Sequence, residues 1–318
     1  MSGAEGYNRT MSVLYIGYEE NDPTWMREIR AADPRIDLRT PADVVDRERV
    51  RYAVVGRTRP GDLEGYPNLE AILSLWAGVE HLLGDETVPR DVPIVRMAEP
   101  SLTRGMVEYV CCHALNILLR TDRYADGGWS HPQKRVPRFA PDIAVGVMGV
   151  GVLGEACAAA LSRLGFAVNG WSRCAKKLDG VSMFAGRAEL APFLGASDIV
   201  VLLLPHTPDT AGVLDREALA HLPAGASVVN AGRGELIDDD ALLEALDADR
   251  LDRAVLDVFR TEPLPRDHRF WHHPRVTVTP HVASVTNPAT AAPVLIDTLN
   301  RLQRGEPVWP LVDRTRGY

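Results

Sequence analysis

The stretch VGVMGVGVLGEACAAAL, from Val145 to Leu161, decides the fold of this chain. It begins within an apolar, β-branched run, Ile143 to Met148, which has the length and composition of a buried parallel strand. A glycine-rich turn follows, and beyond it apolar residues recur with the 3.6-residue period of a helix. The side chains expected on the buried face of that helix are Leu153, Cys157, Ala160, Leu161 and Leu164.

Gly149, Gly151 and Gly154 fit the pattern G-x-G-x-x-G between this strand and this helix. In that context the motif predicts a dinucleotide site. The first glycine permits the tight turn, the second leaves room for a pyrophosphate, and the third lets the helix pack close to the strand. The N–H groups at the start of the helix attract phosphate. An ordinary glycine turn in a βα unit is the alternative.

Short apolar runs alternate with polar or helical segments along the rest of the chain, which indicates parallel α/β sheets. Strands are expected before the motif at 13–16, 36–38, 52–55, 71–76 and 94–95, and after it at 167–171, 198–204, 227–230, 254–259 and 276–279. Helices are expected at 101–120, 188–194, 217–222, 239–246 and 289–304.

This pattern, over 318 residues, predicts two open parallel-sheet domains. Residues 101–286 are expected to form a Rossmann-type dinucleotide-binding domain. Residues 1–100 and 287–318 are expected to form a flavodoxin-like substrate domain, which the C-terminal helix completes by packing back on it. A cleft between the two lobes would hold the substrate.

Composition restricts the partners and the compartment. The formal net charge of −8 argues against nucleic acid or an anionic membrane as the main partner. The four cysteines lack metal-ligand spacing, so reduced thiols in the cytoplasm are expected. The polar N-terminus has no apolar core of a signal peptide, and the most apolar helix, 106–119, is too short and polar to cross a bilayer. His272-His273 has no nearby residues to complete a ligand set, so no metal is expected.

The end of the strand at 167–171 indicates which dinucleotide binds. An NAD site usually carries an acidic residue there to bond the ribose hydroxyls. This chain has Ser172 and Arg173 instead, followed by Lys176 and Lys177. A hydroxyl and a guanidinium bind a 2′-phosphate, so NADP(H) is the expected cofactor, with NAD(H) also possible. Alternatively, Arg173 is a solvated surface charge or stacks on an adenine without selecting the cofactor.

Three charged residues just past predicted strands are candidates for the chemistry: Arg233, Glu262 and His281. Arginine can hold a substrate carboxylate with two parallel hydrogen bonds. Histidine is the usual proton donor near neutral pH, and a neighbouring glutamate favours its charged form. Each residue also has a structural alternative: a surface arginine, a turn cap or a structural histidine.

Several further motifs occur in order along the chain. They are Trp76-Ala77-Gly78-Val79, Gly149 to Gly154, Trp171-Ser172-Arg173, Leu204-Pro205-His206-Thr207-Pro208, Ala231-Gly232-Arg233-Gly234, Leu256-Asp257-Val258-Phe259 with Glu262-Pro263-Leu264, Thr279-Pro280-His281-Val282-Ala283, and the tail from Val312 to Tyr318. With these residues the chain resembles the D-isomer-specific 2-hydroxyacid dehydrogenases, and within them the glyoxylate/hydroxypyruvate reductase A subgroup. The match is dense from about Leu73 to the C-terminus and thin before it.

The resemblance implies roles for individual residues. Arg233 would bind substrate, and His281, paired with Glu262, would be the acid/base. The backbone N–H groups of Ala77, Gly78 and Val79 would hold the substrate carboxylate. Asp257 would bond the nicotinamide carboxamide. The cofactor would also contact Val152, Leu153, Leu204, Pro205, Ala231, Gly232 and Ala283, besides the three glycines of the loop. The family is usually a homodimer joined through its cofactor domains, and Trp129 is a candidate for contact with a partner's cleft.

The expected function is reduction of small 2-keto acids, glyoxylate and hydroxypyruvate first, with NADPH. Trp76 stands where the family pattern has a small residue. Facing the cleft, it would narrow the pocket or stack on a larger substrate such as phenylpyruvate; facing the core, it would not affect specificity. A non-catalytic nucleotide sensor on the same fold is a third alternative, because fold alone does not fix function. A proton donor with its partner argues against a sensor.

Overall fold

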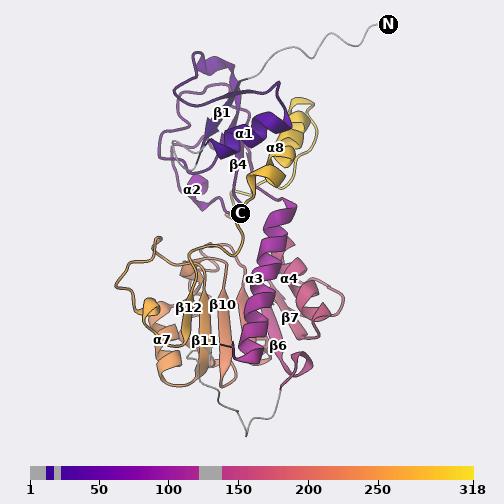
Figure 1. Cartoon of the computed structure of the whole chain (residues 1–318), viewed down its shortest axis with the longest axis vertical. Helices are drawn as coiled ribbons and strands as arrows, with labels where there is room; N and C mark the ends of the chain where they lie inside the picture. Colours follow the sequence, from indigo (N-terminus) through magenta and orange to yellow (C-terminus); the bar gives the residue numbers. More distant parts are fainter. Residues whose placement is uncertain (1–11, 18–22, 122–137) are drawn as a thin grey trace. The chain divides into compact units, whose positions relative to one another are not determined.

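A computed structural model of the chain describes residues 12–17, 23–121 and 138–318. It divides into two compact units, one of Met1–Ser101 with Thr286–Tyr318 and one of Leu102–Val285 (Figure 1). We call them unit 1 and unit 2. Trp129 lies outside the described residues. Among those residues, no helix has the length and apolar character needed to cross a membrane.

Unit 1 is built on a parallel five-stranded sheet with the strand order β2-β1-β3-β4-β5, the flavodoxin-like order. Its strands are β1 (Ser12–Ile16), β2 (Asp37–Arg39), β3 (Val50–Val55), β4 (Ala71–Ser74) and β5 (Ile94–Val95). Its helices are α1 (Thr24–Ala32), α2 (Glu80–Leu83) and α8 (Pro288–Gln303). Helices α1 and α8 lie side by side although they are far apart in sequence (Figure 1). The C-terminal helix therefore completes this unit.

Unit 2 is built on a parallel seven-stranded sheet with the order β12-β11-β10-β9-β6-β7-β8. Its strands are β6 (Ala144–Met148), β7 (Ala167–Ser172), β8 (Ser182–Ala185), β9 (Ile199–Leu202), β10 (Ala226–Asn230), β11 (Leu251–Leu256) and β12 (Val276–Val278). Its helices are α3 (Pro100–Leu119), α4 (Val152–Arg163), α5 (Leu190–Gly195), α6 (Arg216–Ala220) and α7 (Asp239–Asp247). This is the predicted doubly wound Rossmann-type sheet.

Strand β6 is buried on both faces, which explains its continuous apolar sequence. Val145 and Val147 belong to the core under α3 and α4, whereas Met148 faces the opposite core, which includes Phe193. Gly146 makes room on that second face, because a Cβ atom there would lie 2.7 Å from Cζ of Phe193. The two cores cover the two faces of one sheet.

The buried face of α4 and one edge of the seven-stranded sheet differ from the sequence prediction. On α4 the predicted buried position Leu164 is wrong, because this residue caps the end of the helix and is exposed. Gly154 and Ala158 are buried instead, since small residues let α4 approach the sheet. Strand β8 was not predicted. It is an edge strand with a weak, half-exposed apolar pattern, so it lacks the signal of a buried strand.

Candidate active site

The glycine loop lies where the strand order of the seven-stranded sheet reverses. From β6 the chain proceeds to β7 and β8 on one side, and β9 to β12 follow on the other side. Ligands of doubly wound sheets bind at this switch point, beyond the carboxyl ends of the strands. Gly149 directly follows β6 and Leu203 directly follows β9. The loop therefore stands in the expected position for a ligand site.

Gly149 and Gly154 must be glycines, because other backbone atoms lie too close to them to leave room for a side chain. Gly149 has φ of +100°, a conformation that L side chains rarely adopt, and a Cβ atom on it would lie 2.8 Å from the carbonyl oxygen of Leu203. A Cβ on Gly154 would lie 2.0 Å from the carbonyl oxygen of Gly149. The helix can start this close to the strand only because both positions lack a side chain.

Gly151 differs from these two glycines, because a Cβ atom there would meet nothing within 4 Å. It is exposed and forms the N-cap of α4, with no side-chain cap, so the helix N-terminus is open to an anion. Lys176 Nζ donates to the carbonyl oxygen of Val150 at 2.7 Å, which places a positive charge next to the loop. The open backbone and the adjacent positive charge fit a dinucleotide pyrophosphate.

Ser172 and Arg173 lie at the carboxyl end of β7, next to the glycine loop. The Oγ of Ser172 donates to the carbonyl oxygen of Cys174 at 2.6 Å, which folds the turn after the strand. Arg173 is exposed. A hydroxyl and an exposed guanidinium at this strand end match the pattern predicted for a 2′-phosphate site.

The loop that carries Arg233 leaves the end of β10 and is fixed by two glycines. A Cβ on Gly232 would lie 2.8 Å from the carbonyl oxygen of Leu204, and one on Gly234 would lie 2.1 Å from the carbonyl carbon of Phe259. The side-chain amide of Asn230 donates to the carbonyl oxygen of Arg233 at 2.8 Å. Close packing on both sides therefore fixes the backbone from which Arg233 extends.

Glu262 and His281 form a hydrogen-bonded pair. Nδ1 of His281 lies 2.7 Å from Oε2 of Glu262, and Oε1 of Glu262 accepts from the peptide N–H of Phe259 at 2.9 Å. His281 is half exposed, with 49% of its side chain accessible. Because Nδ1 faces Glu262, Nε2 is the ring nitrogen left to meet a substrate.

The electrostatics of Glu262 connect all three predicted catalytic residues. Partial burial by itself would raise the pKa of Glu262, but the hydrogen bonds from His281 and Phe259 and the charges of His281 and Arg233 outweigh it. The pKa of Glu262 is therefore below its ordinary value. The carboxylate stays ionised at neutral pH and faces Nδ1 of His281. Arg233, Glu262 and His281 follow β10, β11 and β12, which are neighbours in the sheet (Figure 1).

Asp257, at the end of β11, is buried, with 1% exposure. Its Oδ1 accepts from Thr279 Oγ1 at 2.6 Å and from the N–H of Val282 at 2.9 Å, and its Oδ2 accepts from the N–H of Ala283 at 2.9 Å. In this structure the carboxylate holds the turn that carries His281. Its contact with a nicotinamide carboxamide stays a prediction.

The remaining predicted cofactor residues of unit 2 lie at the same strand ends. Leu204 follows β9, Ala231 follows β10 and Ala283 lies in the turn after β12; all three are buried. Pro205 is half-buried, and its carbonyl oxygen accepts from Thr210 Oγ1 at 2.7 Å. Val152 and Leu153 begin α4, and the side chain of Val152 is exposed.

The predicted substrate segment of unit 1, Trp76 to Val79, connects β4 to α2. The peptide N–H groups of Ala77, Gly78 and Val79 donate no hydrogen bond to any residue that the structure describes. Successive unengaged N–H groups are a common anion-binding arrangement. Trp76 is half-buried, and its ring meets His81 edge-on with the centroids 5.2 Å apart.

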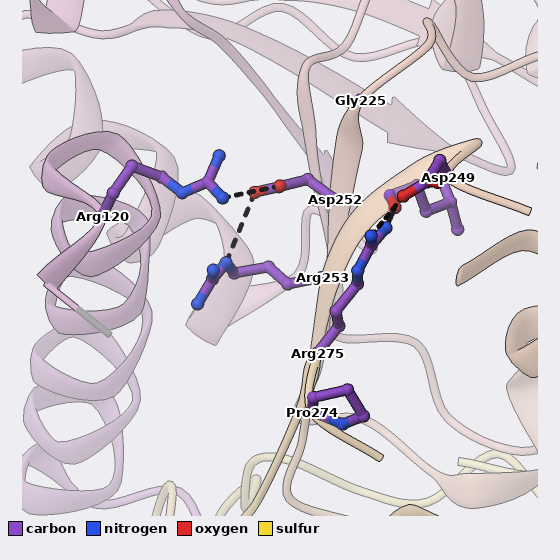
Figure 2. A pocket seen from close by; sticks show the side chains of 8 residues that line it. Arg120, Gly225, Asp249, Asp252, Arg253, Pro274 and Arg275 are labelled. Carbon is purple, nitrogen blue, oxygen red and sulfur yellow. Dashed lines mark hydrogen bonds and ion pairs between the residues drawn. The ribbon is translucent and has the colours of Figure 1, made fainter. Parts of the chain in front are cut away.

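A separate pocket of about 290 Å³ lies at the opposite edge of the sheet, near the starts of β10 and β11. Arg120, Asp252 and Arg253 meet there, and Arg275 reaches Asp249 (Figure 2). Nη2 of the Arg120 guanidinium lies 2.8 Å from Oδ1 of Asp252. These groups are engaged in ion pairs with one another, and none of the predicted site residues lines the pocket. We therefore treat it as part of the structural framework.

Of the two adjacent histidines, His272 is exposed and His273 has structural contacts. Nδ1 of His273 accepts from the N–H of Arg275 at 3.1 Å, and its Nε2 lies 3.2 Å from Asp247. Within the described ranges, no group of three or more histidine, cysteine or acidic side chains is arranged to hold a metal ion.

Sequence reasoning missed two residues that support the site. Thr279 and Tyr109 connect the Asp257 carboxylate to α3 through hydrogen bonds of 2.6 Å and 2.8 Å. Thr279 begins the motif Thr279-Pro280-His281, so its proximity to His281 was visible in the sequence. Nothing in the sequence indicated that Tyr109, 170 positions away, would contact it.

Comparison with known proteins identifies the family. The sequence model described as "D-isomer specific 2-hydroxyacid dehydrogenase, NAD binding domain" matches residues 108–283. Among curated proteins, glyoxylate/hydroxypyruvate reductase A of Klebsiella pneumoniae (strain 342) is 37% identical over 314 residues, which cover 97% of this chain and 100% of the relative.

Solved structures agree with this match. A D-isomer-specific 2-hydroxyacid dehydrogenase from Xanthobacter autotrophicus Py2, in complex with NADPH and MES, has a TM-score of 0.90 and 39% identity over 98% of this chain and 100% of that one. An NADPH-dependent glyoxylate/hydroxypyruvate reductase from Sinorhizobium meliloti, in complex with NADP and sulfate, has a TM-score of 0.88 and 34% identity over 97% of this chain and 100% of that one.

Proposed function

The chain belongs to the D-isomer-specific 2-hydroxyacid dehydrogenase family, and on that premise we propose that it is an NADP(H)-dependent reductase of small 2-keto acids. Glyoxylate and hydroxypyruvate are the proposed substrates, and the products are D-2-hydroxy acids. The observation that carries the proposal is the His281–Glu262 pair, which lies with Arg233 beyond the carboxyl ends of three neighbouring strands. A curated relative carries the name of this activity.

The reaction needs a hydride on the carbonyl carbon and a proton on the carbonyl oxygen. Bound NADPH supplies the hydride. Nε2 of His281 donates the proton, while the ionised Glu262 holds the ring through Nδ1. Arg233 holds the anionic substrate with charge-assisted hydrogen bonds and polarises the carbonyl group. In the reverse direction, neutral His281 takes the proton from the hydroxyl group.

For the cofactor, we assign the pyrophosphate to Gly149, Gly151 and Gly154 at the start of α4. The open position of Gly151 supports this assignment. Ser172 and Arg173 are proposed to bind the 2′-phosphate, which makes NADP(H) the preferred cofactor and leaves NAD(H) as a weaker one. Two structural relatives are in complex with NADPH or NADP. Leu204, Pro205, Ala231, Gly232, Asp257 and Ala283, with Val152 and Leu153, complete the proposed set.

Residues 101–286 are accordingly our proposed cofactor domain, and residues 1–100 with 287–318 the substrate domain. The N–H groups of Ala77, Gly78 and Val79 are the proposed partners of the substrate carboxylate. We further propose a cytoplasmic homodimer joined through the cofactor domain. All four cysteines are free thiols in the structure, which supports a reducing compartment. Light scattering after size-exclusion chromatography measures the oligomeric state, and a monomer would refute the dimer.

The direct test is turnover by the purified protein. NADPH oxidation is followed with glyoxylate, hydroxypyruvate, pyruvate and phenylpyruvate, and each series is repeated with NADH. We expect the highest kcat/KM for the two small substrates with NADPH. Protein that binds NADPH but turns over none of these acids would refute the enzymatic proposal and favour a nucleotide sensor.

The same panel on Trp76→Gly tests the substrate size. If the indole limits the pocket, the variant gains activity on phenylpyruvate relative to glyoxylate. An unchanged order of substrates would assign Trp76 to packing against His81.

A further inference from the structure

The turn that carries His281 is held by Asp257 from both its main chain and its side chain. The N–H of His281 donates to the carbonyl oxygen of Asp257 at 2.8 Å. The N–H groups of Val282 and Ala283 donate to the carboxylate, each at 2.9 Å. Thr279, at the start of the turn, donates its hydroxyl to the same carboxylate at 2.6 Å. One buried acidic residue therefore bonds to both ends and the middle of the turn.

His281 needs such a restraint, because its φ is +54°. The left-handed conformation is unfavourable for a residue with a Cβ atom and persists where the surroundings enforce it. The direction of the imidazole therefore depends on the geometry of the Asp257 carboxylate. Anything that orients this carboxylate also orients His281.

The hydrogen-bond chain continues from Asp257 to helix α3. The Tyr109 hydroxyl lies 2.8 Å from Thr279 Oγ1. Thr279 has one hydroxyl proton, and it is donated to Asp257, which as a carboxylate can only accept. Tyr109 must therefore be the donor to Thr279. The hydrogen bonds therefore all point the same way: Tyr109 donates to Thr279, and Thr279 donates to Asp257.

The surroundings of Tyr109 keep its hydroxyl protonated, so that it can donate to Thr279. Burial raises the pKa of its hydroxyl far above its ordinary value, and the nearby charge of Asp257 adds to this effect. Its ring packs on His113, with the centroids 4.4 Å apart. Burial lowers the pKa of His113, although the charge of Asp257 opposes that shift. The phenol thus stays protonated and is fixed in place by α3.

We propose that Tyr109 and Thr279 are positioning residues for His281, which act through the Asp257 carboxylate on the turn 279–283. Neither needs to touch the substrate. Tyr109 fixes the Thr279 hydroxyl, Thr279 fixes one carboxylate oxygen, and the carboxylate fixes the peptide groups on either side of His281. The inference rests on the proposed function, because it assigns the proton donor of that reaction.

The kinetic test uses Tyr109→Phe, Thr279→Val and Thr279→Ser in the full chain. Losing a hydrogen bond of this kind is expected to lower kcat by about 3- to 10-fold in Tyr109→Phe and Thr279→Val. KM for NADPH should stay within about twofold, and Thr279→Ser should restore kcat because it keeps the hydroxyl. The double variant Tyr109→Phe/Thr279→Val should lose no more than Thr279→Val alone, since Tyr109 acts through Thr279.

Tyr52→Phe is the matched control. It also removes the hydroxyl of a buried tyrosine and its hydrogen bond, which runs 3.0 Å from Tyr52 to the Glu70 carboxylate in unit 1. Its kcat should equal that of the wild type. If Tyr109→Phe and Thr279→Val also keep the wild-type kcat, the inference is overturned. If Thr279→Ser loses as much as Thr279→Val, a packing role replaces the positioning role.

A second measurement does not depend on turnover. Hydrogen exchange of the Val282 and Ala283 amides is compared in wild type, Thr279→Val and Tyr52→Phe. We expect exchange at least about threefold faster in Thr279→Val only, because its Asp257 carboxylate loses an orienting donor. An unchanged rate would overturn the inference even if the enzyme is active. A wild type without turnover but with the accelerated exchange in Thr279→Val would instead refute the proposed reaction and leave the restraint of the turn intact.

Discussion

Nδ1 of His281 lies 2.7 Å from Oε2 of Glu262, although the two residues are 19 positions apart and follow different strands. The second oxygen of Glu262 is held by the N–H of Phe259. The pair therefore has a defined geometry, in which Nδ1 of the imidazole faces Glu262 and Nε2 is the nitrogen left for a substrate.

Removing either member of this pair should affect the chemical step. We expect His281→Gln to lower kcat by about 10²- to 10⁴-fold, because the proton donor is lost. Glu262→Gln should lower kcat by a smaller factor, since the imidazole loses its stabilising charge. KM for NADPH should not change, and steady-state kinetics measure both constants. His272→Gln and Glu217→Gln, both exposed, are the controls; equal losses in the controls would contradict the assignment.

The lowered pKa of Glu262 predicts how stability depends on pH. Because its pKa is lower in the folded than in the unfolded chain, the ionised carboxylate stabilises the fold above the ordinary value of 4.5. This contribution is lost as the pH falls through the folded pKa. The free energy of unfolding should therefore differ between wild type and Glu262→Gln at neutral pH, and the difference should shrink below 4.5. Urea unfolding of both proteins over this range measures it, and a pH-independent difference would contradict the shift.

Two glycines of the same loop should respond differently to alanine. A Cβ on Gly154 would lie 2.0 Å from the carbonyl oxygen of Gly149, so Gly154→Ala should lower the free energy of unfolding by about 2 kcal/mol or more. A Cβ on Gly151 meets nothing within 4 Å, so Gly151→Ala should keep the stability. It should nevertheless weaken NADPH binding, because the new methyl group occupies the proposed pyrophosphate position. Thermal unfolding and NADPH titration separate the two effects; unaltered NADPH affinity in Gly151→Ala would refute this phosphate site.

Arg173 tests the choice between the two dinucleotides. Arg173→Asp should lower kcat/KM with NADPH by at least about tenfold, because a carboxylate repels the 2′-phosphate. The value with NADH should rise or stay constant. Arg90→Asp makes the same charge change at an exposed position of unit 1 and is the control. If the ratio of kcat/KM with NADPH to kcat/KM with NADH changes equally in both variants, long-range charge explains the change and a phosphate contact does not.

Much of the fold could be predicted because its signals are local. Apolar runs gave β6, β9 and β10, and the glycine spacing gave the turn between β6 and α4. The edge strand β8 and the exposure of Leu164 could not be predicted from local pattern. A strand at a sheet edge is half-exposed, and a residue at a helix end need not follow the periodicity of the helix.

The sequence by itself determined the two parallel sheets, the glycine loop, and the order of Arg233, Glu262 and His281 behind successive strands. These follow from short-range periodicity and from motifs that are contiguous in the chain. Only the tertiary structure decided that Glu262 bonds Nδ1 and leaves Nε2, that His281 adopts a left-handed conformation, and that Asp257 fixes its turn. It also brought Tyr109 to Thr279. Such contacts join residues distant in the chain, and sheet order and helix packing, which place them together, are properties of the whole fold.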